Sequence, residues 1–270
     1  MIREFIGTAF LGIVILFGTI SANAGLDEEL VFYLTFDNVK DQTVVNESGN
    51  SLNAKILENT EIVKGKYGNA IHITDDGQDC VSIPSQEKLK VTGEITMMTW
   101  IYYQETWKDK RMLHWLDKGC HSGEGWAGTY GIGSSDIGNG PEIVLFLGSR
   151  EKQGITNRHE FAVLHKMGVQ RWYHVTGSYD GKTMKIYLDG KVIGEKQKGF
   201  NFFGGNDANL RIGCAKNRFQ YAFINGFIDE AAVWQRALSD DEIRQAMAGD
   251  FLAVSPRDKV ATTWAKIKKG

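Results

Sequence analysis

Two neighbouring carboxylates, Asp229 and Glu230, lie inside an apolar run that ends at Trp234. Hydrolysis of a glycosidic bond needs two carboxyl groups about 5 to 9.5 Å apart across a cleft. Consecutive residues of a strand point to opposite faces, so we do not expect these two acids to form such a pair. No acid stands two residues before or two residues after Asp229 to complete one. We therefore predict no catalytic residues.

A glycine-rich segment, residues 117–140, contains eight glycines together with aromatic, amide and acidic side chains. Sugars are recognised by the face of an aromatic ring combined with planar hydrogen-bonding groups. A second segment, residues 216–221, carries aromatic, amide and basic side chains. The candidate ligand-binding residues are Glu124, Trp126, Tyr130, Asn139, Asn217 and Tyr221. The alternative is that the aromatic rings cap the core and the glycines only form turns.

The elements that must position these side chains are strands, because apolar residues alternate with period two along the chain. The alternating runs are residues 30–36, 70–74, 80–83, 95–103, 112–116, 143–147, 160–164 and 172–179. The dipeptides Asp180-Gly181 and Asp189-Gly190 predict tight hairpin turns between three consecutive antiparallel strands. Many short strands with few helices indicate an all-β, antiparallel sandwich.

Only two segments have a helical pattern, and both lie near the C-terminus. Residues 239–249 begin with Ser239 and Glu242 as a capping box and end at Gly249. Residues 255–267 lie within a basic tail, residues 250–270, and carry an apolar stripe. We favour packing of this stripe on the domain over contact with a membrane surface.

The first 24 residues differ from the rest of the chain. An apolar run from Phe5 to Ile20 is followed by Ala22-x-Ala24, which indicates a cleaved secretory signal peptide. We expect one domain at residues 25–249, secreted, at the cell surface or in the periplasm. The net charge of −2 gives no reason to expect a nucleic-acid partner. No glycine pattern predicts a nucleotide cofactor.

Three cysteines, Cys80, Cys120 and Cys214, would meet an oxidising compartment after export. Cys120 and Cys214 each follow a glycine at the end of a strand-like segment. We favour a disulfide between these two and a free Cys80 within a strand, although the connectivity stays open on sequence grounds.

Several phrases together resemble the laminin-G-like, concanavalin A-like jelly rolls over roughly residues 29–248. The matching phrases, in chain order, are residues 30–37, 46–50, 65–71, 95–101, 172–181, 186–190, 210–213, 226–234 and 236–239. The resemblance implies a two-sheet jelly roll, common in secreted carbohydrate-binding and adhesive modules. It also implies a fold that some glycoside hydrolases and polysaccharide lyases share, so the fold does not decide the function.

The same resemblance implies a structural calcium ion between the first and last strands. The expected ligands are Asp37, Asn46, Asn50 and Asp229. Calcium takes six to eight oxygen ligands from carboxylates, amides and backbone. The family usually has an aspartate at the position of Asn46. The asparagine of this chain therefore gives the expected site one negative charge fewer. The alternative is that these residues only stabilise turns and backbone.

From these observations we expect a secreted, non-catalytic binding module that recognises glycans or another extracellular surface. The first alternative is a polysaccharide hydrolase or lyase on the same fold. The second is a structural or adhesive module whose partner is an extracellular protein.

Overall fold

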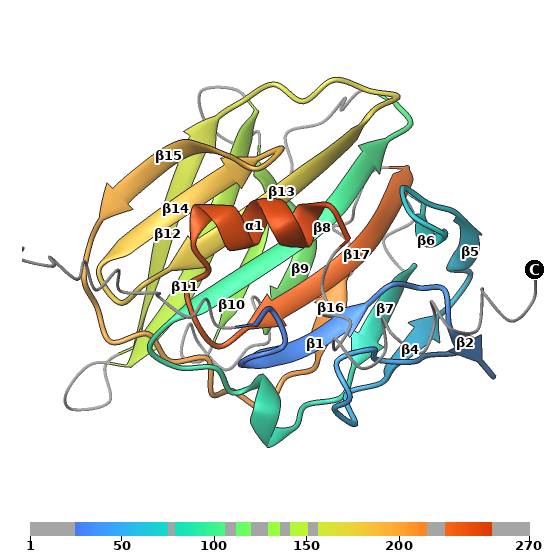
Figure 1. Cartoon of the computed structure of the whole chain (residues 1–270), viewed down its shortest axis with the longest axis horizontal. Coiled ribbons are helices and arrows are strands. Elements are labelled where there is room, and N and C mark those ends of the chain that lie inside the picture. The colour runs from blue at the N-terminus through green and yellow to red at the C-terminus, as the bar shows by residue number, and fades with distance from the viewer. Residues whose placement is uncertain are drawn as a thin grey trace, which may run out of the picture.

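A computed structural model describes residues 25–74, 79–105, 112–119, 129–135, 141–150, 156–214 and 225–249. The predicted signal peptide, residues 1–24, and the C-terminal tail, residues 250–270, lie outside these described residues. Two antiparallel sheets face each other, and one α-helix lies across the front of the first sheet (Figure 1). The predicted all-β, two-sheet sandwich is confirmed. Among the described residues no helix is long and apolar enough to cross a membrane.

Sheet A contains eight strands. In spatial order they are β15 (Lys191–Gln197), β14 (Thr183–Leu188), β13 (Trp172–Tyr179), β8 (Ile95–Tyr103), β17 (Gly226–Trp234), β6 (Asn69–Ile73) and β5 (Glu61–Lys64), with β1 (Leu30–Leu34) also paired to β17. The first and last long strands of the domain are therefore neighbours, as the resemblance implied.

Sheet B contains nine strands. In spatial order they are β12 (Thr156–Leu164), β11 (Glu142–Arg150), β10 (Tyr130–Ser135), β9 (Met112–Lys118), β16 (Leu210–Ile212), β7 (Cys80–Ile83), β4 (Ala54–Leu57), β3 (Thr43–Val44) and β2 (Val39–Lys40). A 3₁₀ turn (Glu87–Leu89) and the helix α1 (Asp240–Met247) complete the described elements.

Local sequence signals place the hairpin and the helix. Asp189 and Gly190 adopt φ angles of 49° and 73°, as a type I′ turn between β14 and β15 requires. The hydroxyl of Ser239 accepts a hydrogen bond from the amide of Glu242, and the carboxylate of Glu242 accepts one from the amide of Ser239, which makes the predicted capping box. Gly249 follows α1 with a φ of 85° and ends it.

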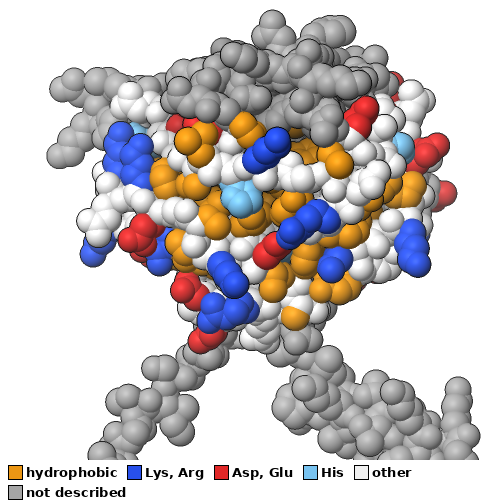
Figure 2. Space-filling model, turned by 90° about the horizontal axis from the view of Figure 1, so that it is seen from above, with side chains coloured by type: hydrophobic (Ala, Val, Ile, Leu, Met, Phe, Trp, Pro, Cys, Tyr) orange, Lys and Arg blue, Asp and Glu red, His pale blue; other side chains and the backbone are white. Residues whose placement is uncertain are grey.

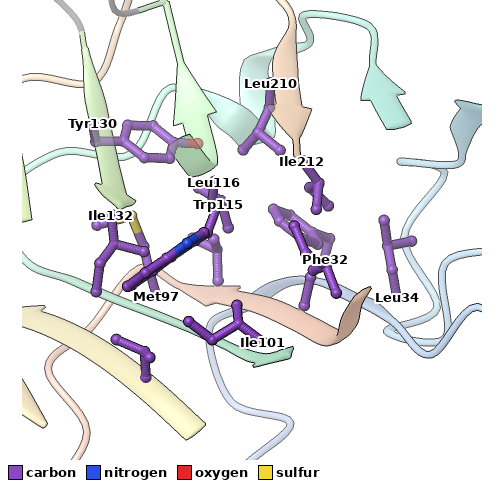
Figure 3. Packing of buried hydrophobic residues seen from close by; sticks show 14 of the residues in the cluster. Phe32, Leu34, Met97, Ile101, Trp115, Leu116, Tyr130, Ile132, Leu210 and Ile212 are labelled. Carbon is purple, nitrogen blue, oxygen red and sulfur yellow. The ribbon is translucent and has the colours of Figure 1, made fainter. Parts of the chain in front are cut away.

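The core lies between the sheets and consists of the inward side chains of both. Figure 3 shows Met97 and Ile101 of sheet A pointing toward Trp115 and Ile132 of sheet B. Trp115 has no exposed surface, and its indole donates a 3.0 Å hydrogen bond to the hydroxyl of Tyr103. Burying the indole with its N–H satisfied stabilises the sandwich without an unpaired polar group.

A second apolar cluster lies on the outer face of sheet A, beneath α1. Met98, Ala232 and Trp234 point outward from β8 and β17 and pack against Ile243 and Ala246 of α1. The helix therefore covers one half of this face (Figure 1).

A β-bulge in β17 changes the expected directions of Asp229 and Glu230. The register with β8 shifts between Asp229 and Ala232, and Glu230 has a φ of 53°. The amide of Tyr67 donates to Asp229, while the hydroxyl of Tyr33 donates to Glu230. Both acids thus lie on the outer face of sheet A. The prediction that they point to opposite faces is wrong, because the extra residue of a bulge breaks the alternation.

The disulfide also differs from the favoured pairing. Cys80, at the start of β7, is bonded to Cys214, just after β16, with a Cα–Cα distance of 5.5 Å. Antiparallel pairing sets Lys118, at the end of β9, beside Leu210, at the start of β16. The segment after β9 and the segment after β16 therefore leave at opposite ends of this pair. Cys120 lies outside the described residues, and the prediction that it pairs with Cys214 while Cys80 stays free is corrected.

Candidate functional site on the outer face of sheet B

Charged and small side chains form a row across the outer face of sheet B. Each member lies directly opposite the next on the neighbouring strand, from β12 to β4. The row is Glu160, Phe146, Gly131, Asp117, Arg211, Ser82 and Lys55. A sheet face that meets only water would carry exposed polar residues. Several members of this row are buried instead.

Beneath the row lies a buried contact between an imidazole and a carboxyl group. Nδ1 of His114 lies 2.9 Å from Oδ2 of Asp117, and the two side chains are 0% and 2% exposed. Residues three apart on a regular strand point to opposite faces. Here the register between β9 and β10 shifts next to Trp115, so a bulge brings both side chains to the outer face. Burial makes the pair a fixed arrangement rather than a loose surface contact.

Phe146 forms the apolar part of this base. Its ring meets the ring of His114 edge to face, with centroids 5.2 Å apart, and the guanidinium of Arg158 lies 5.1 Å from its centre. A Cβ atom at Gly131 would overlap the Phe146 ring, so glycine is required beneath it. Glu160, whose side chain is 46% exposed, is ion-paired with Arg158 and forms part of the rim.

The carboxylates of this row do not have the spacing of a glycosidase. Asp117 and Glu160 lie on strands three apart in the sheet, which separates their backbones by about 14 Å. Glycosidases place the two carboxyl groups about 5 to 9.5 Å apart. The row can therefore offer hydrogen bonds and charges to a polar ligand, but these two acids do not form a hydrolytic pair.

Most of the predicted ligand-binding residues lie outside the described residues. These are Glu124, Trp126, Asn139, Asn217 and Tyr221. Their segments join β9 to β10, β10 to β11, and β16 to β17. All three segments therefore begin at strands of sheet B, which carries the row.

Tyr130 is described, and the structure corrects its predicted role. Its side chain has no exposed surface, and its hydroxyl donates a 3.0 Å hydrogen bond to the carbonyl of Leu89. Burial raises the pKa of the phenol above its usual range. Tyr130 belongs to the core, as the alternative for these aromatics proposed, and its ring is not available to a ligand.

The four predicted calcium ligands fall into two separate sets of hydrogen bonds. Oδ1 of Asp37 accepts from the amide of Asn69 at 2.7 Å, and Oδ2 of Asp229 accepts from the amide of Tyr67 at 3.0 Å. Both aspartates thus hold the turn between β5 and β6. Gly68 is needed in this turn, because it has a φ of 47° and a Cβ atom would overlap Asp37.

The two asparagines instead satisfy the free edge of β1. Oδ1 of Asn46 accepts from the amide of Tyr33 at 2.8 Å, and the amide of Asn50 donates to the carbonyls of Leu30 and Val31. The ammonium of Lys88 donates to Oδ1 of Asn50. Side-chain hydrogen bonds of this kind protect an edge strand from pairing with another chain.

In this arrangement the predicted ligands do not fit a calcium ion. Each of them has at least one side-chain oxygen that already accepts a hydrogen bond, and the ammonium of Lys88 donates to one of these oxygens. Within the described ranges, no group of three His, Cys, Asp or Glu side chains could hold a metal ion. Calcium binding stays a prediction.

Asp229 and Glu230 are chemically perturbed although they are not in a cleft. Burial and the charge of Glu230 raise the pKa of Asp229 to about 8, against its hydrogen bonds to backbone amides. Burial, with the charge of Asp37, raises the pKa of Glu230 to about 7, although the hydrogen bond from Tyr33 favours the charged form. The side chains are 0% and 4% exposed. Acids with shifted pKa values are often functional. The carboxylates of these two instead accept hydrogen bonds from groups of the protein itself.

The sequence interpretation missed the residues of the row and those that pack against it. His114, Asp117, Arg158 and Arg211 come together only through the strand order and the bulge in β9. One local signal was present: Gly131 and Gly133 alternate along β10. Glycines on one face of a strand indicate the close approach of another group.

Comparisons with known proteins agree with this fold. A family described as the concanavalin A-like lectin/glucanases superfamily matches residues 75–244, well over half of the chain. No curated protein matches the sequence.

Several solved structures are similar. The binding domain of Paraclostridial Mosquitocidal Protein 1 is 17% identical, with a TM-score of 0.61, over 83% of this chain and 53% of that one. Domain 4 of AbnA, a GH43 extracellular arabinanase from Geobacillus stearothermophilus, in complex with arabinotriose, is 16% identical, with a TM-score of 0.61, over 81% and 98%. The binding domain of botulinum neurotoxin DC in complex with SialylT is 16% identical, with a TM-score of 0.59, over 85% and 53%. This chain thus spans about half the length of the toxin domains, and at these identities the likeness shows the fold.

Proposed function

The chain belongs to the concanavalin A-like lectin/glucanase superfamily, and from this premise we propose that it is a non-catalytic binding module. Its ligand is a glycan or another extracellular surface. Its site is the outer face of sheet B, with the row from Glu160 to Lys55 as the base.

The observation that carries the proposal is the buried contact between an imidazole and a carboxyl group on an outward face. His114 and Asp117 are withdrawn from water although they point away from the core between the sheets. Burying polar groups costs free energy, and the cost is offset only by hydrogen bonds or other polar partners. Such an arrangement suits a preformed site that presents polar groups in fixed directions.

The chemistry of the row suits a hydroxylated ligand. Arg211 lies directly opposite Asp117 on the next strand and is half-buried. A guanidinium presents five donors in one plane, and the neighbouring carboxylate accepts hydrogen bonds. Sugars and polar protein surfaces both offer hydrogen-bond donors and acceptors that such groups can bind. A purely apolar ligand would leave the charged groups unsatisfied.

Similar structures support a binding role. Their titles describe binding domains, one in complex with arabinotriose, one with SialylT and one with rat synaptotagmin II. Two of these ligands are glycans and one is a protein. The same superfamily contains glucanases. For this chain, the wide separation of Asp117 and Glu160 favours binding over hydrolysis.

Export and calcium have different places in this proposal. Export is part of it and rests on the apolar run and the Ala22-x-Ala24 motif of the first 24 residues. Calcium is not part of it, because the four predicted ligands are committed to hydrogen bonds.

A glycan array with the mature protein tests the function. We expect saturable retention of at least one glycan, no release of reducing ends or unsaturated products, and the same retention in EDTA. Arg211→Ala should weaken retention at least ~10-fold, since a buried or half-buried arginine is a typical hot spot. The matched control is Arg244→Ala. It removes an exposed arginine from α1, on the opposite side of the sandwich.

The outcomes separate the three functions. Product formation would overturn the binding module in favour of the hydrolase or lyase. Retention of no glycan by a folded protein would favour the adhesive module with a protein partner. Equal retention by wild type and Arg211→Ala would remove the outer face of sheet B as the site.

A further inference from the structure

We propose that the half of the outer face of sheet A left open by α1 is a second binding site, for a neutral glycan chain lying across the strands. This inference rests on the proposed function for the class of ligand. It concerns the opposite side of the sandwich from the outer face of sheet B. The site is an aromatic row formed by Trp172, Tyr102, Phe227 and His72.

The row is built by the register of four neighbouring strands. Trp172 of β13 lies opposite Tyr102 of β8, Tyr102 lies opposite Phe227 of β17, and Phe227 lies opposite His72 of β6. Directly paired residues point to the same face of a sheet. The four rings therefore form one line perpendicular to the strands.

The rings join into a continuous aromatic surface. The rings of Tyr102 and Phe227 are stacked, with centroids 5.3 Å apart and planes at 26°. Trp172 and Phe227 lie two strands apart, so their backbones are separated by about 10 Å. Their ring centroids are only 6.3 Å apart. The indole of Trp172 must therefore lean across Tyr102 toward Phe227, and it lies along the row.

The position of the row shows that the core does not need it. All four rings are partly exposed, while their inward neighbours Ile101 and Ile228 are fully buried. The outward positions further along the same strands, Met98 and Trp234, are covered by α1. Outward positions that no element covers are usually polar. A line of aromatic rings there is better explained by a ligand than by folding.

Figure 1 places the end of β8 and the starts of β13 and β17 at the same upper end of the molecule. Figure 2 looks onto that end and shows hydrophobic side chains exposed among Lys, Arg, His, Asp and Glu. The views agree with a surface in which apolar and hydrogen-bonding groups are mixed.

The charges around the row favour a neutral ligand. At one end, Arg171 is paired with Asp189 at 2.8 Å. At the other end, His72 lies 3.7 Å from Glu61 and hydrogen bonds to the side chain of Asn225 at 2.8 Å. These groups contribute no excess of positive charge that would attract an acidic polysaccharide or a membrane surface.

The same groups favour a glycan over an apolar protein surface. A sugar ring has an apolar C–H face that an aromatic ring can contact, and hydroxyl groups that amide, imidazole and carboxylate groups can bind. The row combines both kinds of group and contains no aliphatic side chain. It also continues over four strands, so it suits a run of several sugar units rather than a single one.

Titration calorimetry with the mature protein tests the site, with arabinotriose, arabinohexaose, xylohexaose and cellohexaose as neutral probes and trigalacturonate as the charged probe. We expect at least one neutral hexasaccharide to bind more tightly than its shorter homologue, with an affinity that salt does not change. Trp172→Ala should weaken this binding at least ~10-fold. Trp172→Tyr should restore part of it.

Two variants serve as controls. Leu164→Ala removes an exposed hydrophobic side chain from the edge strand β12, where 60% of the residue is exposed, and should leave binding unchanged. Arg211→Ala disables the outer face of sheet B, so the hexasaccharide binding that remains in this variant is the part that belongs to the aromatic row. Thermal melting of each variant shows that it is folded.

The outcomes distinguish the site from the function. Binding that Arg211→Ala abolishes and Trp172→Ala leaves unchanged overturns the aromatic row and keeps the binding module. Binding to trigalacturonate alone overturns the neutral ligand. Self-association that Trp172→Ala abolishes, without glycan binding, replaces the glycan by a second copy of the chain. No binding of any probe to the folded wild type overturns the aromatic row as a glycan site and leaves the binding module to be decided by the glycan array.

Discussion

The two outer faces of the sandwich have different chemistry on similar scaffolds. The outer face of sheet B carries a buried contact between His114 and Asp117, and a glycine, Gly131, that admits Phe146. The outer face of sheet A carries hydrophobic and aromatic residues, half of them under α1. Inward residues are apolar on both sheets, because that is what the core requires. The differences between the outward faces are therefore where functional demands can be seen.

The halves of sheet A separate folding from binding most clearly. Trp234 is fully buried under α1, and its indole donates a 2.6 Å hydrogen bond to the carbonyl of Leu26. Trp234→Ala should lower the free energy of unfolding by about 3 to 5 kcal/mol, the usual cost of removing a large buried aromatic side chain. Trp172→Ala, in the open half, should cost only about 1 kcal/mol.

Urea unfolding followed by circular dichroism measures both changes. An equal loss in the two variants would mean that the aromatic row belongs to the folded core of the domain. The contrast between a covered and an open half would then disappear.

The disulfide extends the comparison to sheet B. The disulfide links β7 to β16 across a sequence separation of 134 residues. Cys214→Ala removes this link and should lower the free energy of unfolding by about 2 to 4 kcal/mol. Cys120→Ala should change it by less than about 0.5 kcal/mol.

Peptide mapping under non-reducing conditions gives an independent reading. A cross-linked peptide that contains Cys80 and Cys214 is expected. A peptide that joins Cys120 to Cys214, together with a large loss in Cys120→Ala, would restore the pairing that the sequence favoured.

The buried acids on sheet A should make stability depend on pH near neutrality. A carboxyl whose pKa is raised on folding keeps its proton in the folded state at a pH where the unfolded chain has lost it. Its stabilising effect is present at low pH and is lost as pH rises toward the folded value. With pKa values of about 8 for Asp229 and about 7 for Glu230, the free energy of unfolding should fall between pH 7 and 8.

Glu230→Gln tests this slope, because glutamine keeps a similar shape without the ionisation. It should lessen the decline, whereas Glu61→Gln, whose side chain is 72% exposed in the native chain, should not. His174 does not interfere in this window, since burial lowers its pKa to about 3 and the unfolded imidazole is mostly neutral above pH 7. A wild-type stability that stays flat or rises from pH 7 to 8 would contradict the assignment.

The sequence predicted the parts of the fold that local chemistry decides. Asp189-Gly190 can adopt positive φ angles, and Ser239 with Glu242 can satisfy the first amides of a helix, whatever surrounds them. The disulfide and the row on sheet B depend on strand order, which local patterns do not contain. The bulges beside Trp115 and at Glu230 shift the alternation by one residue, and no residue type in either strand marks them.

The smallest expected effect concerns calcium. A cation bound by Asp37 and Asp229 would have to replace the amides of Asn69 and Tyr67, which already donate to these carboxylates. Both amides belong to the turn between β5 and β6, so the exchange would also loosen that turn. We therefore expect a calorimetric titration with calcium to give no saturable heat, and EDTA to leave the melting temperature unchanged. Saturable heat that Asp229→Asn abolishes would show that the carboxylates exchange their backbone partners for the ion. The outer face of sheet A would then carry a calcium site at Asp37 and Asp229 in addition to the aromatic row.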